Sequence, residues 1–215
     1  MDTSHGARLA GALSIGLGAA AFPVAAEAQT PAPAPAPKLH LHAKHHIMYG
    51  STGSVKGSLT SGASNKRVIV QIRSGRRWKT VARTHTRAGG RFRTHWRGNR
   101  LGRFNLRVKA PGTGARPRNA QRNITVYRRA AASWYGPGLY GNKLACGGTL
   151  TPGTLGVANK TLPCGTKVTL RYHGHTATVP VVDRGPYAAG RDYDLTAATK
   201  NRLHFGSTGT VLSSR

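Results

Sequence analysis

The sequence predicts an all-β protein with two domains, an N-terminal β-sandwich of immunoglobulin-like type and a C-terminal β-barrel that carries one short helix. From about residue 47 to residue 127, apolar and polar side chains alternate in short runs separated by turn residues, as expected for about seven short strands. The composition then changes. Residues 38–129 hold 23 Lys or Arg and no acidic residue, whereas residues 133–215 hold both cysteines, three Asp and 9 Lys or Arg. A change of this size indicates a domain boundary.

The first 28 residues have the pattern of a signal peptide. His5 and Arg8 precede an apolar run over residues 9–24, and Ala26-Glu27-Ala28 has the small-x-small form of a cleavage site. The alternative is a membrane anchor, but the run is short and is interrupted by glycines and a proline. We therefore expect an exported, extracellular protein with no transmembrane segment after cleavage, and no lipid anchor, because the segment lacks cysteine.

Residues 29–44 are expected to be a linker. Pro and Ala alternate over residues 31–37, which is typical of a stiff polyproline-II spacer. Four His follow within residues 40–46, and such a cluster could bind a transition metal, although a solvated, flexible segment is the favoured interpretation. No metal and no cofactor is predicted.

Residues 45–129 are predicted to form the basic β-sandwich. The alternating apolar positions fall in four runs, Val68-Val70-Ile72, Phe92-Thr94-Trp96, Phe104-Leu106-Val108 and Ile124-Val126. Lys and Arg fill many of the outward positions between them. Solubility explains where these cations point, but not why no Asp or Glu shares the outer face. The composition therefore predicts a face that binds a polyanion.

The overall charge limits the partners further. There are 33 Lys and Arg against 5 Asp and Glu, and two of the acids, Asp2 and Glu27, lie in the predicted signal peptide. The mature chain would keep only Asp183, Asp192 and Asp194. Nucleic acid, acidic lipid and anionic cell-wall polymers are candidate partners for such a chain. Export argues against nucleic acid.

The second domain is expected over residues 132–215, with Ala130-Ala131-Ala132 as a hinge before it. Residues 167–172 and 176–182 are typical of strands, joined by a tight turn at His173-Gly174. A helix is expected to start at Asp194, with Leu195, Ala198 and Leu203 on one face. Fewer than ninety residues of mainly short strands favour a compact barrel.

The two cysteines, Cys146 and Cys164, are expected to form a disulfide, because an exported chain with a single pair of cysteines has no other partner for either. A metal pair would need further ligands nearby, and a catalytic thiol would need a nearby His. Both alternatives are less favoured.

Four motifs follow in order along the second domain. They are Ala132-Ser133-Trp134-Tyr135-Gly136-Pro137-Gly138, Val157-Ala158-Asn159-Lys160-Thr161-Leu162-Pro163-Cys164-Gly165-Thr166, Val182-Asp183-Arg184-Gly185-Pro186-Tyr187 and Asp194-Leu195-Thr196-Ala197-Ala198. Together they resemble the rare lipoprotein A (RlpA)-like family, over residues 132 to about 210. The resemblance implies a double-psi β-barrel, related to expansins, with an open groove for a β-1,4-linked glycan. The sandwich is not part of it.

The resemblance also implies an activity and its site. Bacterial members include lytic transglycosylases, which cleave peptidoglycan between N-acetylmuramic acid and N-acetylglucosamine and leave a 1,6-anhydro end. The family's catalytic Asp corresponds to Asp183, and Asn159 stands at the position of its catalytic His. Glycosidic cleavage generally needs a proton donor for the leaving oxygen, and one carboxyl group can serve first as acid and then as base. Carboxylates are therefore the expected catalytic groups.

Each candidate carboxylate also has a structural interpretation. Asp183 could bond backbone amides in its turn and pair with Arg184. Asp194 is a possible catalytic residue, but a helix cap is the favoured role. Asp192 could point the same way as Asp194 or pair with Arg191.

Aromatic and basic side chains complete the predicted site. Trp134, Tyr135, Tyr140, Arg184 and Tyr187 are the candidates for substrate binding, although the first three could instead be barrel core. Any of the histidines His173, His175 and His204 could replace the missing family His in space.

Three classes of function remain. The leading one is a secreted peptidoglycan-active enzyme, a lytic transglycosylase or related hydrolase. The second is a non-catalytic, expansin-like module that binds wall glycan, supported by Asn159. The third is a structural protein held on anionic wall polymers by its basic sandwich.

Overall fold

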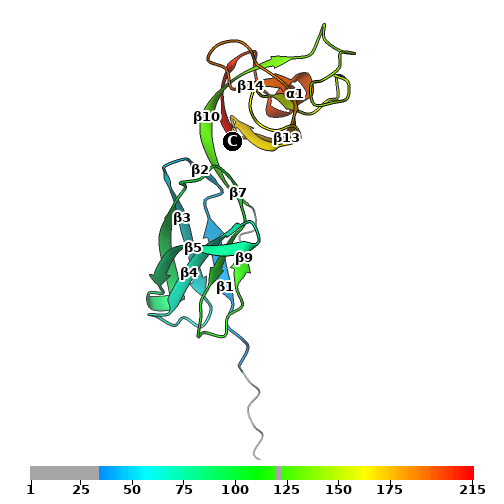
Figure 1. Cartoon of the computed structure of the whole chain (residues 1–215). Coiled ribbons are helices and arrows are strands. Elements are labelled where there is room, and N and C mark those ends of the chain that lie inside the picture. Colours follow the sequence, from blue (N-terminus) through cyan, green and yellow to red (C-terminus); the bar gives the residue numbers. More distant parts are fainter. Residues whose placement is uncertain (1–33, 120–122) are drawn as a thin grey trace, which may run out of the picture. The chain divides into compact units, whose positions relative to one another are not determined.

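The computed structural model describes residues 34–119 and 123–215, and the predicted signal peptide lies outside them. The described residues are mainly β-strands, with a short 3-10 turn, η1 (Ala88–Gly90), and one α-helix, α1 (Ala197–Leu203) (Figure 1). No helix in these two ranges has the length and apolar character needed to cross a bilayer. The chain is therefore all-β in class, as predicted.

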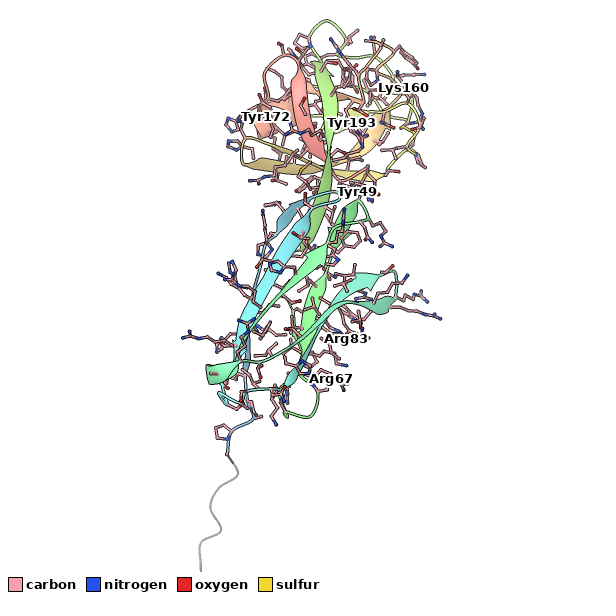
Figure 2. All side chains as sticks on the ribbon, turned by 90° about the vertical axis from the view of Figure 1, so that its left-hand side faces the viewer. Tyr49, Arg67, Arg83, Lys160, Tyr172 and Tyr193 are labelled. Atoms are coloured by element: carbon pink, nitrogen blue, oxygen red, sulfur yellow. A yellow bond between two sulfur atoms is a disulfide. The ribbon has the colours of Figure 1, made fainter. Side chains whose placement is uncertain are left out.

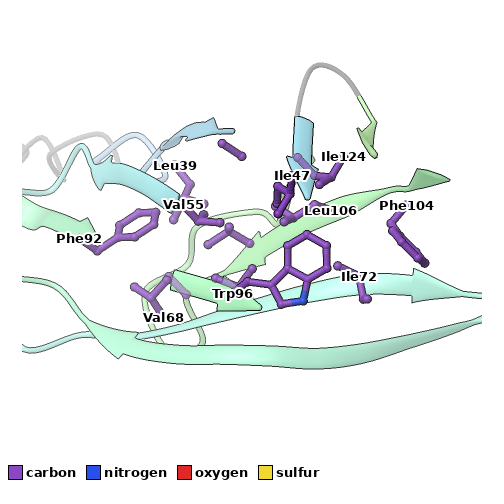
Figure 3. Close-up of a cluster of buried hydrophobic side chains, with 14 of the residues drawn as sticks. Leu39, Ile47, Val55, Val68, Ile72, Phe92, Trp96, Phe104, Leu106 and Ile124 are labelled. Carbon is purple, nitrogen blue, oxygen red and sulfur yellow. The ribbon is translucent and has the colours of Figure 1, made fainter. Parts of the chain in front are cut away.

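Two antiparallel sheets build the first domain. One has the order β1-β3-β6 and the other β5-β4-β8-β9. Their strands are β1 (Leu39–Ala43), β3 (Thr52–Leu59), β4 (Arg67–Ser74), β5 (Arg77–His85), β6 (Arg91–Arg97), β8 (Leu106–Lys109) and β9 (Arg118–Asn119). Apolar side chains from both sheets share one core, including Val55 and Trp96 from the first and Val68 and Leu106 from the second (Figure 3). This arrangement is a β-sandwich, and its immunoglobulin-like type stays a prediction.

Three expectations about this part of the chain are wrong. The His-rich segment is not linker, because residues 39–43 form β1, which pairs with β3 and buries Leu39 and Ala43. The run around Phe104 is two strands, since β7 (Gly102–Phe104) pairs with β10 (Ile124–Tyr135) and β8 pairs with β4. The alanines expected as a hinge lie inside β10, where they are hydrogen-bonded to β15 (Gly209–Ser213).

The second domain is a closed barrel of six strands. The order is β14-β11-β13-β12-β15-β10, and pairing of β14 with β10 closes it. The strands not yet given are β11 (Val157–Ala158), β12 (Lys167–Tyr172), β13 (His175–Asp183) and β14 (Tyr193–Thr196), while β2 (His46–Met48) pairs with the other half of β10. Among the pairs of the barrel itself, β10–β14 and β11–β13 are parallel and the others are antiparallel. Parallel neighbours in so small a barrel require long crossing connections, and these connections build the site.

Local chemistry explains two features of the barrel. The β12–β13 hairpin turns at His173 and Gly174, both with positive φ (40° and 95°), which is the backbone of a two-residue type I′ turn. Helix α1 begins at Ala197, three residues later than expected, because Thr196 is its N-cap and its side chain accepts a hydrogen bond from the Thr199 amide. The expected helix-cap role of Asp194 is therefore wrong, since this residue lies in β14.

Candidate functional site

Two of the three carboxylates in the described residues lie on neighbouring parts of one barrel face. Ala158 of β11 is the register partner of Asp183 on β13 and of Asp194 on β14. Directly paired residues on regular adjacent strands share a face of the sheet, which places Asp194 beside Ala158. The register of β11 with β13 shifts between Val157 and Ala158, and the nearness of Asp183 to Asp194 is shown by Tyr135, whose pKa both carboxylates raise. The preceding row, Val157 with Leu195, points into the barrel core. Two strand spacings put the Cα atoms of the two Asp roughly 9–10 Å apart.

Asp183 is oriented by backbone amides. Its Oδ1 accepts hydrogen bonds from the Ala145 amide and the Arg184 amide, each at 2.9 Å. The Asp183 carbonyl also accepts a bond from the Asn159 amide at 3.1 Å. The expected hydrogen bonding of Asp183 to backbone amides is confirmed. Both of these bonds end at the same oxygen, so Oδ2 takes part in neither of them.

Arg184 does not pair with Asp183. Its guanidinium donates to the carbonyls of Asn159 (3.2 Å) and Leu162 (2.9 Å) and lies 3.1 Å from Sγ of Cys164. These contacts hold the segment that follows β11 against the end of β13. Within the ranges that the structure describes, the one ion pair is between Arg128 and Asp192, at 2.9 Å. The expected pairings of Asp183 with Arg184 and of Asp192 with Arg191 are therefore wrong.

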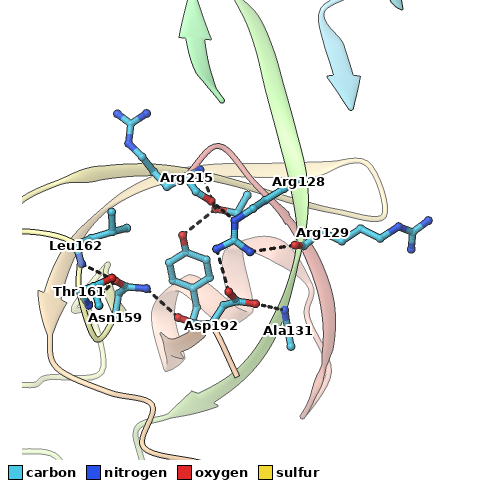
Figure 4. A network of polar contacts seen from close by, with 10 residues as sticks. Arg128, Arg129, Ala131, Asn159, Thr161, Leu162, Asp192 and Arg215 are labelled. Atoms are coloured by element: carbon cyan, nitrogen blue, oxygen red, sulfur yellow. Dashed lines mark hydrogen bonds and ion pairs between the residues drawn. The ribbon is translucent and has the colours of Figure 1, made fainter. Parts of the chain in front are cut away.

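The side chain of Asn159 is bonded at both ends. Its Oδ1 accepts from the amides of Thr161 (3.1 Å) and Leu162 (2.8 Å), and its Nδ2 donates to the carbonyl of Asp192 (2.9 Å). Only 8% of this residue is exposed. The amide of Asn159 thus closes a turn and joins it to the segment before β14 (Figure 4).

Asp192 continues this network. Its Oδ2 accepts from the Ala131 amide at 2.9 Å, and its Oδ1 pairs with Arg128 (Figure 4). Arg128 also donates to the Arg215 carbonyl at 2.6 Å. The third carboxylate therefore links β10, the segment before β14 and the C-terminal end of the chain, and it has no free side facing Asp183.

Asp194 and a tyrosine hydroxyl lie on the same face as Asp183. Asp194 is paired in register with Ser133, whose hydroxyl donates to its carboxylate. Two residues further along β10, the hydroxyl of Tyr135 is buried beside the carboxylates of Asp183 and Asp194. Burial, followed by the negative charge of Asp183, a hydrogen bond to Asp183 and the negative charge of Asp194, strongly raises the pKa of Tyr135. This phenol therefore stays protonated and can donate a hydrogen bond at any physiological pH.

The predicted disulfide is confirmed. Cys146 and Cys164 are joined, with their Cα atoms 5.5 Å apart. The Cys146 amide bonds the Val182 carbonyl at 3.2 Å, next to the contact between Ala145 and Asp183. The cross-link therefore ties together the two loops that contact the end of β13.

The other substrate-binding candidates have different surroundings. Trp134 is half-buried against the barrel core, and the Lys200 ammonium lies over its ring at 4.5 Å from the centroid. Tyr140 and Tyr187 are 38% and 84% exposed. Of the aromatic candidates, Tyr140 and Tyr187 can stack on a ligand without any rearrangement of the core. His175 and His204 lie against each other, 4.1 Å between ring centroids, and His173 packs on Tyr172.

Sequence reasoning missed the partners of the carboxylates. Ser133 stands in the first motif, but its pairing with Asp194 depends on the register of β10 with β14. The Ala145 amide belongs to the backbone, so no residue type in the sequence indicates its bond to Asp183. Only its position next to Cys146 could have pointed to it. For Arg128, the parallel pairing of β10 brings it to Asp192, 64 residues away, which no local pattern reveals.

The closed barrel with two parallel strand pairs and crossing loops defines the C-terminal part of the chain as a double-psi β-barrel. More particularly, this part is similar to RlpA-like barrels. Residues 128–212 match a family model described as lytic transglycolase.

Curated relatives agree with this assignment. The probable endolytic peptidoglycan transglycosylase RlpA of Synechocystis is 38% identical over 93 residues, 42% of this chain and 29% of the relative. The endolytic peptidoglycan transglycosylase RlpA of Campylobacter jejuni is 41% identical over 82 residues, 37% of this chain and 30% of the relative. A probable RlpA of Aquifex aeolicus is 35% identical over 95 residues, 43% of this chain and 42% of the relative. This chain spans less than half the length of each, and the similarity is to its barrel domain.

Proposed function

We propose that the protein is a peptidoglycan lytic transglycosylase that cleaves the β-1,4 link between N-acetylmuramic acid and N-acetylglucosamine. The observation that carries the proposal is the Asp183 carboxylate, oriented through Oδ1 by two backbone amides, with Oδ2 outside both of these bonds. The family match and the printed activity of the relatives support the substrate class.

One carboxyl group can perform the reaction in two steps. The protonated Asp183 gives its proton to the leaving O4 of N-acetylglucosamine as the bond between C1 and O4 breaks. The resulting carboxylate then takes the proton of the 6-hydroxyl of N-acetylmuramic acid as O6 bonds to C1, which forms the 1,6-anhydro end and restores the acid. No water is consumed. The negative charge of Asp194 on the same face stabilises the positive charge that develops on the sugar ring.

The remaining residues assist in this proposal without exchanging protons. Asn159 cannot accept or release a proton near neutral pH, and its amide already holds the turn. Tyr135 remains a hydrogen-bond donor because its pKa is strongly raised. Tyr140 and Tyr187 are exposed and are the candidates to stack on sugar rings. A second positioned acid–base group typically contributes about 10² to 10⁴ in rate. Because Asn159 cannot serve as that group, we expect slow turnover.

A second candidate function is a non-catalytic module that binds wall glycan, as expansins do. The specific observation that favours it is Asn159, which replaces the family His and is committed to structural hydrogen bonds. In this case Asp183 would bind a sugar hydroxyl and would not transfer its proton.

The proposal places the protein outside the cytoplasm, exported and associated with the cell wall, where its substrate lies. Its proposed partners are peptidoglycan glycan strands and anionic cell-wall polymers, the latter bound by the basic sandwich. No nucleic acid is proposed as a partner.

Digestion of purified sacculi, with mass analysis for anhydro-muropeptides, tests the proposal. Wild-type protein should release such products, and Asp183→Asn should lower release by about 10²-fold or more while sacculus binding is retained. Asp192→Asn is the matched control, since it removes a carboxylate of the same barrel that is engaged with Arg128. Products that survive Asp183→Asn would refute its catalytic role. Binding without products for every protein would instead support the non-catalytic module.

A further inference from the structure

The outer face of the sheet β1-β3-β6 carries rows of cations. Along each strand, exposed residues alternate with buried ones, so His42, Lys56 and Arg93 point outward. The strand register puts these three side chains directly opposite one another in a single row across the sheet. The next row contains His40 and Arg91, on either side of Ser58.

Such a row is unfavourable in the free protein. Like charges directly opposite on neighbouring strands repel each other, and proteins usually place an acid between them. Residues 38–129 contain no Asp or Glu, so no acidic side chain of this domain can neutralise Lys56 and Arg93. The sandwich core does not require cations here, because its own residues point the other way. The arrangement therefore calls for an anion supplied from outside.

The same face is hollowed into a groove. A groove of about 990 Å³ follows β1, β3 and β6, and Arg87 beside η1 and Arg118 of β9 also line it. Its cations thus come from several segments that are far apart in the sequence. The exposed Arg67 and Arg83 lie on the other sheet and do not line this groove (Figure 2).

The spacing of the cations suits a polymer better than a single ion. Arg91 and Arg93 are two residues apart on β6, and outward side chains of one strand are about 6.8 Å apart. A linear polymer whose charges lie in its own backbone can present successive anions to such a series. The guanidinium groups can bind the two free oxygens of a phosphodiester with paired hydrogen bonds.

The groove lacks the features of two other kinds of site for anionic partners. Single-stranded nucleic acid binds where exposed aromatic side chains stack on the bases. Phe92 lines the groove but is only 3% exposed and belongs to the core, as does Trp96, which is 5% exposed. A membrane-binding face pairs cations with exposed apolar side chains. The large apolar side chains exposed within the described ranges are Tyr49, Leu139, Tyr140, Leu155 and Tyr187, and none of them lines the groove.

We propose that this groove is a docking site for a phosphodiester polymer of the cell envelope, bound along β6 with Lys56, Arg91 and Arg93 as its central contacts. The inference deepens the proposed function, because it names the surface and the chemistry by which the sandwich would hold the barrel at the wall. It does not depend on whether the barrel cleaves glycan.

Equilibrium binding of the mature, full-length protein to a fluorescent poly(glycerol phosphate) tests the proposal. The double variant Lys56→Gln/Arg93→Gln removes two groove charges. The matched control Arg76→Gln/Arg77→Gln removes the same charge from two exposed residues outside the groove, one in the turn after β4 and the other at the start of β5. We expect Kd to rise about tenfold or more for the groove variant and less than about threefold for the control. The slope of log Kd against the logarithm of the salt concentration should become smaller by the equivalent of about two phosphate contacts, and only for the groove variant.

Each other outcome overturns the proposal. Equal losses in the two variants would show that binding follows net charge and not the groove. Tighter binding of polyglutamate would reject the phosphodiester, and tighter binding of single-stranded DNA would reject an envelope polymer. Both variants change exposed side chains, and unchanged thermal unfolding would show that neither loss comes from misfolding. The binding measurement with poly(glycerol phosphate) contains no glycan. Failure of the wild-type protein to release anhydro-muropeptides from sacculi would therefore count against the proposed activity and not against the groove.

Discussion

Asn159→Ala should destabilise the barrel measurably. The wild-type side chain makes three hydrogen bonds, to the Thr161 and Leu162 amides and to the Asp192 carbonyl, and the residue is only 8% exposed. A typical intramolecular hydrogen bond stabilises a protein by about 1 kcal/mol net. Of the partner residues left behind, Leu162 and Asp192 are half-buried and Thr161 is exposed. Loss of all three therefore costs about 3 kcal/mol in the free energy of unfolding. For a chain of this size the melting temperature should fall by about 6–12 °C.

Thermal unfolding followed by circular dichroism measures this effect. Asn142→Ala is the control, because Asn142 is exposed on the same domain and its side chain is in none of the hydrogen bonds of the described residues. Its free energy of unfolding should differ from that of the wild type by no more than about 0.5 kcal/mol. Asn159→His should cost only about 1 kcal/mol, since one ring nitrogen can accept and the other donate, which keeps two of the three bonds. If the enzyme is limited by Asn159, the same variant should release more anhydro-muropeptide. An Asn159→Ala protein as stable as the control would refute the role of the amide in holding the turn.

Two further predictions concern the cross-link and the buried phenols. Replacing Cys146 and Cys164 by Ser should lower the free energy of unfolding by about 3 kcal/mol, because the disulfide closes a loop with a sequence separation of 18 residues. Urea denaturation measures this loss, and a loss below about 1 kcal/mol would contradict the prediction. Burial raises the pKa of Tyr127, Tyr135 and Tyr193. Above about pH 10 the unfolded chain therefore releases protons that the folded chain keeps, and the free energy of unfolding must fall as the pH rises. Urea midpoints at pH 8, 9, 10 and 11 should therefore be constant at first and then decrease, and a midpoint that rises above pH 10 would show that these hydroxyls are not buried.

The parts of the fold that depend on local patterns could be predicted from the sequence. The strands around Val70 and Phe92 have clear alternation, and the His173-Gly174 turn has the residue types that positive φ favours. The disulfide followed from counting cysteines. Leu39, Leu41 and Ala43 alternate in the same way, but the high histidine content of this segment favoured a linker over the strand β1.

The parts that depend on long-range pairing could not be predicted. An Asp before a stretch of helix-forming residues is a normal cap signal, but Asp194 belongs to β14, because β14 is held between β11 and β10. Its place beside Ala158, opposite Asp183, follows from the register of three strands that are distant in the sequence. The motifs led to Asp183 as the candidate carboxylate, whose catalytic role stays a prediction, but only the fold shows which amides orient it.

The disulfide also links the surroundings of Asp183 to the redox conditions that an exported protein is expected to meet. The amide of Ala145 that holds the Asp183 carboxylate lies beside Cys146, and Arg184, which clamps the opposite loop, contacts Cys164. In a reducing compartment both cysteines remain thiols, and neither loop is tied to the other. The carboxylate then loses the support that orients it. Oxidation would thus act as the final assembly step, after which the protein meets its substrate with the site already ordered.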